Sequence, residues 1–282
     1  MQIIETKQEL RRVINSARRS NHSIGFVPTM GYLHEGHLSL MRRARRENDL
    51  VVTSVFVNPA QFGPREDLDT YPRNDARDKE LMLKERVDIA FFPTVSELYP
   101  DGYSTYVEVK GSLTQGLCGR SRPRFFRGVT TIVAKLFHLV TPDRAYFGAK
   151  DAQQSAVVRQ MVKDLDFNLK IVVCPTVREA DGLAMSSRNS YLSPQHRTDA
   201  VVISKSLESA RQMIADGERN AHKIYQSIKR EIDKVPDAII DYIAVVDAMT
   251  LVDVKTLNGE ILIAAAIKLA GTRLIDNIQI KL

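Results

Sequence analysis

The sequence predicts an α/β protein: a Rossmann-like, doubly wound parallel sheet followed by a second, smaller α+β domain. Up to about residue 176, short apolar runs alternate with longer amphipathic helical patterns, which is typical of parallel βαβ units. Beyond Val177 the pattern changes to two helical stretches and then three β-like runs. A chain of 282 residues has room for roughly two domains. We therefore expect one domain over residues 1–176 and a smaller, lid-like domain over residues 177–282.

The expected strands of the sheet are short and separated by turns or helical patterns. Residues 50–57 are nearly all apolar, as expected for a central strand covered by helices on both faces. The other expected strands are residues 23–27, 88–92, 145–147 and 169–173. Helices are expected from Gly36 onward and over 77–86, 129–139 and 151–165, with Leu38, Met41 and Ala44 of the first facing the core.

The smaller domain combines helices with a run of strands at the end of the chain. Helical patterns cover residues 194–215 and 221–235. The β-like runs are 239–246, 261–267 and 273–280, with turn signals at Asn258-Gly259 and at Gly271 between them. This order of elements predicts an α+β arrangement.

Composition and charge narrow the class of protein without identifying a ligand. With 44% hydrophobic and 26% charged residues the chain is an ordinary globular one, which excludes collagen-like and disordered classes. The net charge of +6 favours anionic ligands in general. Cys118 and Cys174 have no metal-ligand spacing, which suits a reducing compartment. We expect a soluble, cytoplasmic protein, because the first twenty residues lack a signal peptide's apolar core and no apolar run could span a bilayer.

Two common nucleotide-binding fingerprints do not fit. No GxGxxG follows a predicted strand. The stretch GSLTQGLC has the glycine spacing of a P-loop, but Leu117 and Cys118 stand where Lys and Ser or Thr belong. Dehydrogenase and P-loop kinase functions are therefore disfavoured.

The motif PTMGYLHEGH, residues 28–37, follows the first predicted strand and leads into a helix. Open α/β sheets bind ligands at this edge, and a helix N-terminus offers unpaired N–H groups to phosphate. His34 and His37 would add side-chain donors for the same anion, while Gly31 and Gly36 would let the backbone approach a nucleotide closely. A bare HxxH is more often a surface feature, but its placement between strand and helix favours a functional role.

Three further polar clusters are candidates for the same site. Asn58 and Gln61 follow the central strand and could hold hydroxyl and carboxylate groups, although an ordinary Asn-Pro turn explains Asn58 equally well. In FGAKDAQQ, Lys150 can reach phosphate, and Asp151 can accept from ribose or simply cap a helix. The fourth cluster, DGLAMSSRN, places two serines beside an arginine in a loop that could close over a triphosphate or be a polar linker.

Taken together, these segments resemble the pantothenate synthetase family, the pantoate and β-alanine ligases of the HxGH nucleotidylyltransferase superfamily. The resemblance spans the chain, because the matching motifs run in order from one end to the other. They are PTMGxLHxGH at 28–37, FVNPxQF at 56–62, YPR at 71–73, RPxxFRG at 122–128, PDxAYFGxKDxQQ at 142–154, PTVREADGLAMSSRN at 175–189 and RLIDN at 273–277. HxGH alone marks only the superfamily, whereas this ordered set is specific.

The resemblance implies an ATP-dependent ligase of pantothenate biosynthesis, on the way to coenzyme A. Pantoate and ATP would form pantoyl adenylate and pyrophosphate, and β-alanine would then displace AMP. The implied catalytic residues are His34, His37 as proton donor, and Lys150. Pantoate and β-alanine are assigned to Gln61, Gln154 and the nearby Asn58. The implied ATP-binding residues are Met30, Gly31, His34, Gly36, His37, Gly148, Lys150, Asp151, Val177, Met185, Ser186, Ser187 and Arg188. Mg²⁺ is expected on the ATP phosphates and not in a cage built by the protein.

The chain departs from the family pattern at three places near the expected site. Cys118 stands where the family usually has Glu, Arg124 and Phe125 replace Gly and His, and Ala149 replaces Glu. None of these is a residue with a central role. The family is typically a homodimer, and the resemblance implies the same here.

The sequence leaves two rival functions open. One is another HxGH nucleotidylyltransferase, which would transfer AMP or CMP to a phosphate-bearing acceptor and would have no need for the FVNPAQF and KDAQQ pair. The other is nucleic-acid binding, suggested by the basic run at residues 42–46. That run has no interleaved aromatic residues and is more typical of a solvated helix face, so we expect no nucleic-acid or membrane partner.

Overall fold

The computed structural model describes residues 1–64 and 66–282, which fall into two compact units. The first unit is Met1–Val109, Arg124–Ala149 and Val157–Pro175. The second unit is Lys110–Pro123, Lys150–Ala156 and Thr176–Leu282. The division into two domains at residue 177 stays a prediction. The compact units differ from it, because Lys110–Pro123 and Lys150–Ala156 group with the C-terminal part of the chain.

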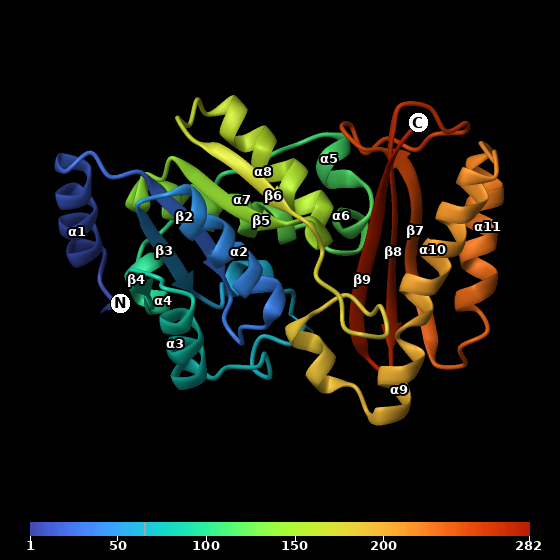
Figure 1. Cartoon of the computed structure of the whole chain (residues 1–282), viewed down its shortest axis with the longest axis horizontal. Helices are drawn as coiled ribbons and strands as arrows, with labels where there is room; N and C mark the ends of the chain where they lie inside the picture. Colours follow the sequence, from blue (N-terminus) through green and yellow to red (C-terminus); the bar gives the residue numbers. More distant parts are fainter. Residues whose placement is uncertain (65) are drawn as a thin grey trace. The chain divides into compact units, whose positions relative to one another are not determined.

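A six-stranded parallel sheet forms the centre of the first unit (Figure 1). Its order is β1-β4-β3-β2-β5-β6, with every pairing parallel. The strands are β1 (Gln2–Ile4), β2 (Ile24–Thr29), β3 (Leu50–Val55), β4 (Ile89–Phe91), β5 (Arg144–Gly148) and β6 (Lys170–Cys174). From β2 the chain winds outward through β3 and β4, and from β5 it winds the other way to β6. The doubly wound sheet is therefore confirmed, with its switch point between β2 and β5.

Helices cover both faces of this sheet. On one face, α2 (Glu35–Glu47) and α3 (Asp75–Lys84) bury Met41 and Ala44 against the strands, with Leu38 packed beside them as predicted. On the other face lie α1 (Lys7–Arg19) and α7 (Phe125–Val140), where Phe137 meets Phe26 edge to face at a centroid distance of 6.3 Å. Phe26 and Val27 point to opposite faces, because side chains alternate along a strand.

Several short elements were not predicted from the sequence. The three-residue edge strand β1 is too short to show a periodicity, and α1 follows it directly. The 3₁₀ helix η1 (Pro59–Gln61) follows β3, which ends two residues earlier than expected. The remaining short helices are α4 (Val95–Leu98), α5 (Ser112–Gln115), α6 (Cys118–Ser121), η2 (Ala149–Asp151) and η3 (Ser187–Tyr191). The predicted helix over 151–165 is α8 (Ala152–Asp164).

A three-stranded antiparallel sheet forms the core of the second unit (Figure 1). Its strands are β7 (Ala238–Asp247), β8 (Glu260–Leu269) and β9 (Thr272–Lys281), so the three predicted runs are confirmed. One face packs against α10 (Val202–Ala215) and α11 (Ala221–Ile232). The opposite face packs against Leu113 and Leu117, close to α5 and α6. The small α+β part predicted from the sequence is thus present.

The predicted helix over 194–215 is wrong in one respect, because it is two helices. α9 (Pro194–Asp199) ends and α10 begins on either side of Ala200 and Val201. Both residues are buried in the core of the second unit, so tertiary packing breaks the helix where the sequence has no Gly or Pro to mark an end. None of the helices in the described part of the chain is long and apolar enough to cross a membrane.

Candidate active site

The predicted histidine motif forms the turn from β2 into α2, at the carboxyl end of a central strand. Gly31 adopts a φ of +82°, and a Cβ there would stand 2.9 Å from Val55 Cγ1. Tyr32 also has a positive φ, of 50°. The turn therefore requires glycine at position 31 both for its conformation and for its close approach to β3.

The carboxylate of Asp78 on α3 holds this turn in place. Asp78 is fully buried and accepts hydrogen bonds from the backbone N–H of Tyr32 at 2.7 Å and of Leu33 at 2.8 Å. Burial raises the pKa of this carboxyl group, while the two backbone donors oppose the rise. Asp78 is not among the residues predicted from the sequence. Its signal was an acidic residue four positions before Met82, on the buried stripe of a predicted helix.

His34 and His37 are brought together at the start of α2. Their rings are 4.1 Å apart between centroids, tilted by 38°, and both residues are half-buried. The backbone N–H of His34 donates to Nδ1 of His37 at 3.3 Å. Because that nitrogen accepts, neutral His37 carries its proton on Nε2. The motif thus presents an imidazole donor beside the backbone N–H groups of a helix N-terminus.

Asn58 and Gln61 lie at the same edge of the sheet, because they follow β3, the neighbour of β2. Asn58 is 1% exposed, and its side chain caps η1 by accepting from the N–H of Ala60. Its Nδ2 donates to Gln61 Oε1 at 3.0 Å and to the carbonyl oxygen of Gly128 at 3.1 Å. The turn role considered for Asn58 is therefore present, and contact with substrate stays a prediction for both residues.

Helix α7 approaches η1 at Gly128 more closely than any side chain would permit. A Cβ at this position would overlap the carbonyl group of Ala60. The glycine of the RPRFFRG segment therefore lets α7 pack directly on the backbone that carries Gln61.

Gly148 ends β5, the strand on the other side of the switch point from β3. No described heavy atom lies within 4 Å of the place where its Cβ would stand. The carboxyl ends of β2, β3 and β5 thus bring Met30, Gly31, His34, Gly36, His37, Asn58, Gln61 and Gly148 to one edge of the sheet in the first unit.

Lys150, Asp151 and Gln154 follow β5 in the chain and belong to the second unit. Lys150 Nζ lies 3.6 Å from Asp151 Oδ2, and its backbone carbonyl accepts from Asn277 Nδ2 on β9 at 2.8 Å. Gln154 is half-buried, whereas its neighbour Gln153 is buried.

Gln153 has a purely internal role that its sequence motif does not indicate. Its Oε1 accepts from the N–H of Cys118 at 2.9 Å, and its Nε2 donates to the carbonyls of Leu113 and Gly116. The two glutamines of KDAQQ thus differ in burial, and the first anchors the segment that contains α5 and α6.

Residues 177–188 begin as a hairpin and end in η3. Met185 N–H donates to the carbonyl of Val177, and Ser186 Oγ caps η3 at the N–H of Arg188. Ser187 is buried, and Arg188 is half-buried. Arg178 ties the hairpin to β9 through a bidentate pair with Asp276, at 2.6 and 3.0 Å. The RLIDN segment therefore anchors both this hairpin, through Asp276, and the Lys150 turn, through Asn277.

Cys118, one of the three departures from the family pattern, lies among polar side chains of the second unit. Its Sγ is 3.4 Å from Tyr242 Oη and 3.4 Å from Arg273 Nη2. Arg273 also pairs with Asp241 at 2.6 Å, so a carboxylate neutralises this guanidinium even though position 118 carries none.

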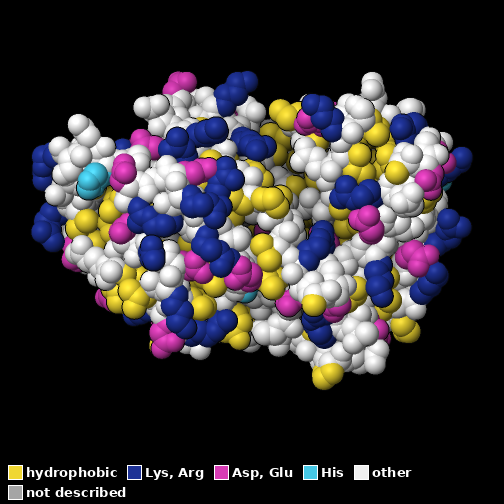
Figure 2. All heavy atoms as spheres, viewed as in Figure 1, with side chains coloured by type: hydrophobic (Ala, Val, Ile, Leu, Met, Phe, Trp, Pro, Cys, Tyr) yellow, Lys and Arg dark blue, Asp and Glu magenta, His cyan; other side chains and the backbone are white. Residues whose placement is uncertain are grey.

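The basic run of α2 is a solvated face with internal ion pairs. Arg42 pairs with Glu35 and Glu85, Arg43 with Glu47, and Arg45 with Asp88. Figure 2 shows Lys and Arg side chains interspersed with Asp and Glu over the α2 and α3 region. This arrangement differs from the one-sign patch that nucleic-acid binding requires.

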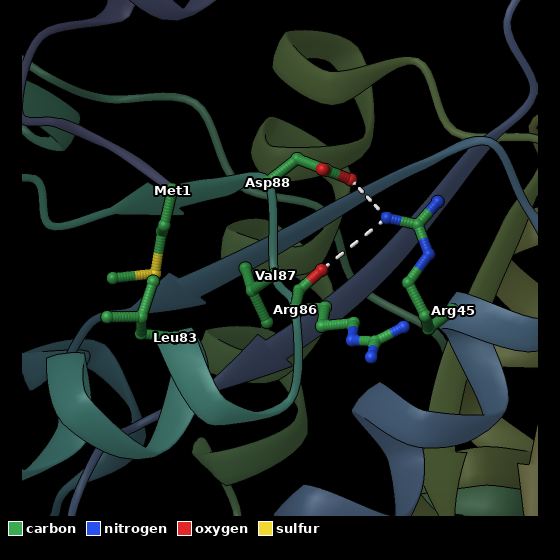
Figure 3. A pocket seen from close by; sticks show the side chains of 6 residues that line it. All are labelled: Met1, Arg45, Leu83, Arg86, Val87 and Asp88. Atoms are coloured by element: carbon green, nitrogen blue, oxygen red, sulfur yellow. Dashed lines mark hydrogen bonds and ion pairs between the residues drawn. The ribbon is translucent and has the colours of Figure 1, made fainter.

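A hollow elsewhere on the first unit lies at the amino ends of β1 and β4, away from the polar edge (Figure 3). It is lined by Met1, Leu83, Val87 and the charged residues Arg45, Arg86 and Asp88. Arg45 donates to Asp88 at 2.6 Å and to the carbonyl of Arg86 at 3.4 Å. The Arg45 guanidinium is thus paired with other residues that line the hollow. None of the lining residues is a predicted site residue.

Fold and polar edge together define a doubly wound α/β protein of the nucleotide-binding type. The family model described as pantoate-beta-alanine ligase matches residues 2–279. The pantothenate synthetase of Acetivibrio thermocellus is 55% identical over 100% of both chains. That of Thermotoga petrophila is 52% identical over 98% of this chain and 99% of its own. The chain therefore belongs to the pantoate–β-alanine ligase family.

Solved structures agree with this assignment. Pantothenate synthetase from Thermus thermophilus superposes with a TM-score of 0.94 at 46% identity, covering 99% of each chain. The pantoate–β-alanine ligase from Francisella tularensis, complexed with β,γ-ATP and β-alanine, superposes with a TM-score of 0.80 at 35% identity, covering 99% of this chain and 97% of its own. The alternative of another HxGH nucleotidylyltransferase is not favoured.

Replacing Asp78 by Asn tests the support of the histidine turn. The amide keeps one acceptor oxygen but turns an NH₂ group toward the second backbone N–H, which leaves a buried donor unsatisfied. We expect the free energy of unfolding to fall by about 1–3 kcal/mol, measured by urea unfolding. Asp75→Asn, on the same helix but exposed, is the matched control, and equal stability of the two variants would contradict this role.

Replacing Gly128 by Ala tests the contact between α7 and η1. The new Cβ would overlap the Ala60 carbonyl, so we expect a loss of about 1–3 kcal/mol in the free energy of unfolding, measured by chemical denaturation. Gly116→Ala, where no described atom lies within 4 Å of the Cβ position, should be far milder. A Gly128 variant as stable as this control would show that the two elements can separate freely.

Cys118→Ala should be mild for activity, because Asp241 already neutralises Arg273. We expect turnover within about threefold of the parent protein, which corresponds to less than about 1 kcal/mol in the activation free energy. Steady-state kinetics would measure this, with Cys174→Ala as the control for loss of a buried thiol. A severe and specific loss at Cys118 would mean that the thiol has a direct catalytic task.

Proposed function

We propose that this chain catalyses the ATP-dependent condensation of pantoate with β-alanine to pantothenate, through a pantoyl-adenylate intermediate. The observation that carries the proposal is one polar edge of the parallel sheet: the paired histidines at the start of α2 lie beside the η1 turn that carries Gln61. Donors for phosphate and an amide for a hydroxy acid thus occur together at the edge where such sheets bind nucleotides. Family membership specifies the acid and the amine.

In the first step, a pantoate carboxylate oxygen forms a bond to the α-phosphorus of ATP, and the bond to pyrophosphate breaks. Carboxylate is a weak nucleophile, so alignment and neutralisation of charge have to supply the rate. Gln61 and Gln154 hold pantoate, with Asn58 near it. Nε2 of His37 donates a hydrogen bond to the departing phosphate oxygen and stabilises its developing charge, which fits the tautomer imposed by the His34 N–H.

The remaining nucleotide contacts come from three groups of residues. Met30, Gly31, Gly36 and Gly148 offer close backbone approach at the sheet edge, while Lys150 and Asp151 contact phosphate and ribose. Val177 lies against adenine, and Met185, Ser186, Ser187 and Arg188 form the closing segment over the phosphates. Mg²⁺ enters on the phosphates of ATP, since it keeps much of its water and binds few protein carboxylates.

In the second step, the amine of β-alanine attacks the acyl carbon of the adenylate. The amine loses a proton, the C–O bond to AMP breaks, and the amide of pantothenate forms. No covalent enzyme intermediate is needed, so neither cysteine has a nucleophilic role. We further propose that the enzyme acts in the cytoplasm as a homodimer.

The decisive experiment is pantoate-dependent exchange of labelled pyrophosphate into ATP, with Mg²⁺ present and β-alanine absent. We expect exchange only when pantoate is added, because the adenylate forms reversibly before the amine enters. Exchange that occurs without pantoate, or the absence of exchange with folded protein, would overturn the proposed acid substrate. A nucleotidylyltransferase with a phosphate-bearing acceptor would instead exchange only with that acceptor.

His37→Ala should lower the exchange rate by about 10²–10³-fold, the usual contribution of one preorganised hydrogen-bond donor to developing charge, and leave the protein folded. Lys150→Ala should be similarly damaging, because it removes a charge from the phosphates. His222→Ala and Arg46→Ala are the controls for loss of an exposed histidine and of a charge on a solvated helix. Near-normal exchange in His37→Ala would remove this residue from the mechanism.

A further inference from the structure

Tyr99 is a hydrogen-bond donor that no role assigned above includes. It follows α4 directly and is half-buried in the first unit. Its hydroxyl donates to Asn58 Oδ1 at 2.9 Å, a shorter contact than the 3.3 Å from the N–H of Ala60 to the same oxygen. The side chain that caps η1 is therefore held from outside the turn by a tyrosine.

The orientation of the Asn58 amide follows from its backbone partners. The N–H of Ala60 can only donate, so the atom that faces it must be oxygen. The carbonyl of Gly128 can only accept, so the other atom must be nitrogen. Tyr99 therefore donates to Asn58, and all four hydrogen-bonding positions of this amide are used within the protein.

The orientation of the Asn58 amide determines that of the Gln61 amide. Asn58 Nδ2 can only donate, so the Gln61 atom 3.0 Å away must be the oxygen Oε1. The nitrogen Nε2 then lies on the opposite side of the Gln61 amide. A donor suits an acid substrate, because carboxylate and hydroxyl oxygens accept hydrogen bonds, whereas a flipped amide would present an acceptor.

We propose that Tyr99 is a positioning residue for the acid substrate: through Asn58, its hydroxyl holds the Gln61 amide with Nε2 as the donor to pantoate. The inference rests on the proposed function, because it takes pantoate as the ligand of Gln61. It adds a residue that does not itself touch the substrate. Loss of the hydroxyl leaves Oδ1 of Asn58 with the longer Ala60 contact alone, so the asparagine holds the Gln61 amide less firmly.

The surroundings of Tyr99 keep its ring in place and its hydroxyl protonated. The ring meets Phe56 at 6.2 Å and Tyr103 edge to face at 4.9 Å between centroids. Lys135 Nζ lies 5.6 Å from its centroid. Burial raises the pKa of Tyr99 above its usual value near 10, so the phenol remains a donor throughout the neutral range.

The test compares Tyr99→Phe with Tyr103→Phe in the pyrophosphate exchange assay. Both variants keep the aromatic packing and lose one hydroxyl from the same cluster, but only Tyr99 bonds to Asn58. For Tyr99→Phe we expect KM for pantoate to rise about three- to tenfold, as for loss of one hydrogen bond. KM for ATP should match that of Tyr103→Phe, and any further loss of stability should not exceed about tenfold in the equilibrium constant of unfolding, the contribution of one hydrogen bond.

Two further readouts separate positioning from general damage. In a Gln61→Ala background, Tyr99→Phe should change KM for pantoate no further, because the residue through which it acts is gone. The ratio of parent to variant KM should stay constant from about pH 6 to pH 9, since the hydroxyl does not ionise there. A ratio that approaches one as the pH rises would contradict a neutral donor.

The outcomes distinguish this inference from the proposed function. If the parent protein shows pantoate-dependent exchange but Tyr99→Phe behaves like Tyr103→Phe, the positioning role is overturned and the function stands. If Tyr99→Phe raises KM for pantoate and ATP equally, or adds its full effect in the Gln61→Ala background, the role is likewise overturned. If the parent shows no pantoate-dependent exchange, the function fails and the inference with it.

Discussion

The buried carboxylate of Asp78 is the interaction on which the polar edge of the sheet depends. It binds the N–H groups of Tyr32 and Leu33 in a turn where Gly31 and Tyr32 both have positive φ. A free chain seldom adopts that conformation at two successive residues. By satisfying two backbone donors, Asp78 stabilises the turn that leads into α2 and therefore the placement of His34 and His37.

Around the other predicted site residues, too, one set of side chains is assigned to ligands and another set holds the structure in place. The side chains assigned to ATP and acid are mostly half-buried, whereas Asp78, Asn58 and Asp276, which hold neighbouring groups in place, are almost fully enclosed. Asn58 is 1% exposed and orients Gln61, and Asp276 is 3% exposed and anchors the hairpin that leads to Ser186. Enclosed polar groups need hydrogen-bond partners within the protein, so each of them is held in one arrangement.

Much of this was accessible from the sequence. The order of strands and helices, the polar motifs at strand ends and the C-terminal three-stranded run all follow from local periodicity and turn residues, and family motifs named the candidate residues. The elements that escaped are short or lack a local cause. β1 has only three residues, η1 depends on an asparagine cap, and the break between α9 and α10 falls at Ala200 and Val201, which mark no helix end by themselves.

The class of fold, the family and the chemical types of the candidate site residues follow from the sequence alone, because they depend on periodicity, motif order and side-chain chemistry. Which polar residues hold the scaffold together becomes visible only in the folded chain. Gln153 and Gln154 are adjacent in one motif, yet only the first is buried with three backbone partners. Asp78 and Tyr99 are distant in the chain from the residues they hold. Such roles arise from hydrogen bonds between separate elements, which no local pattern records.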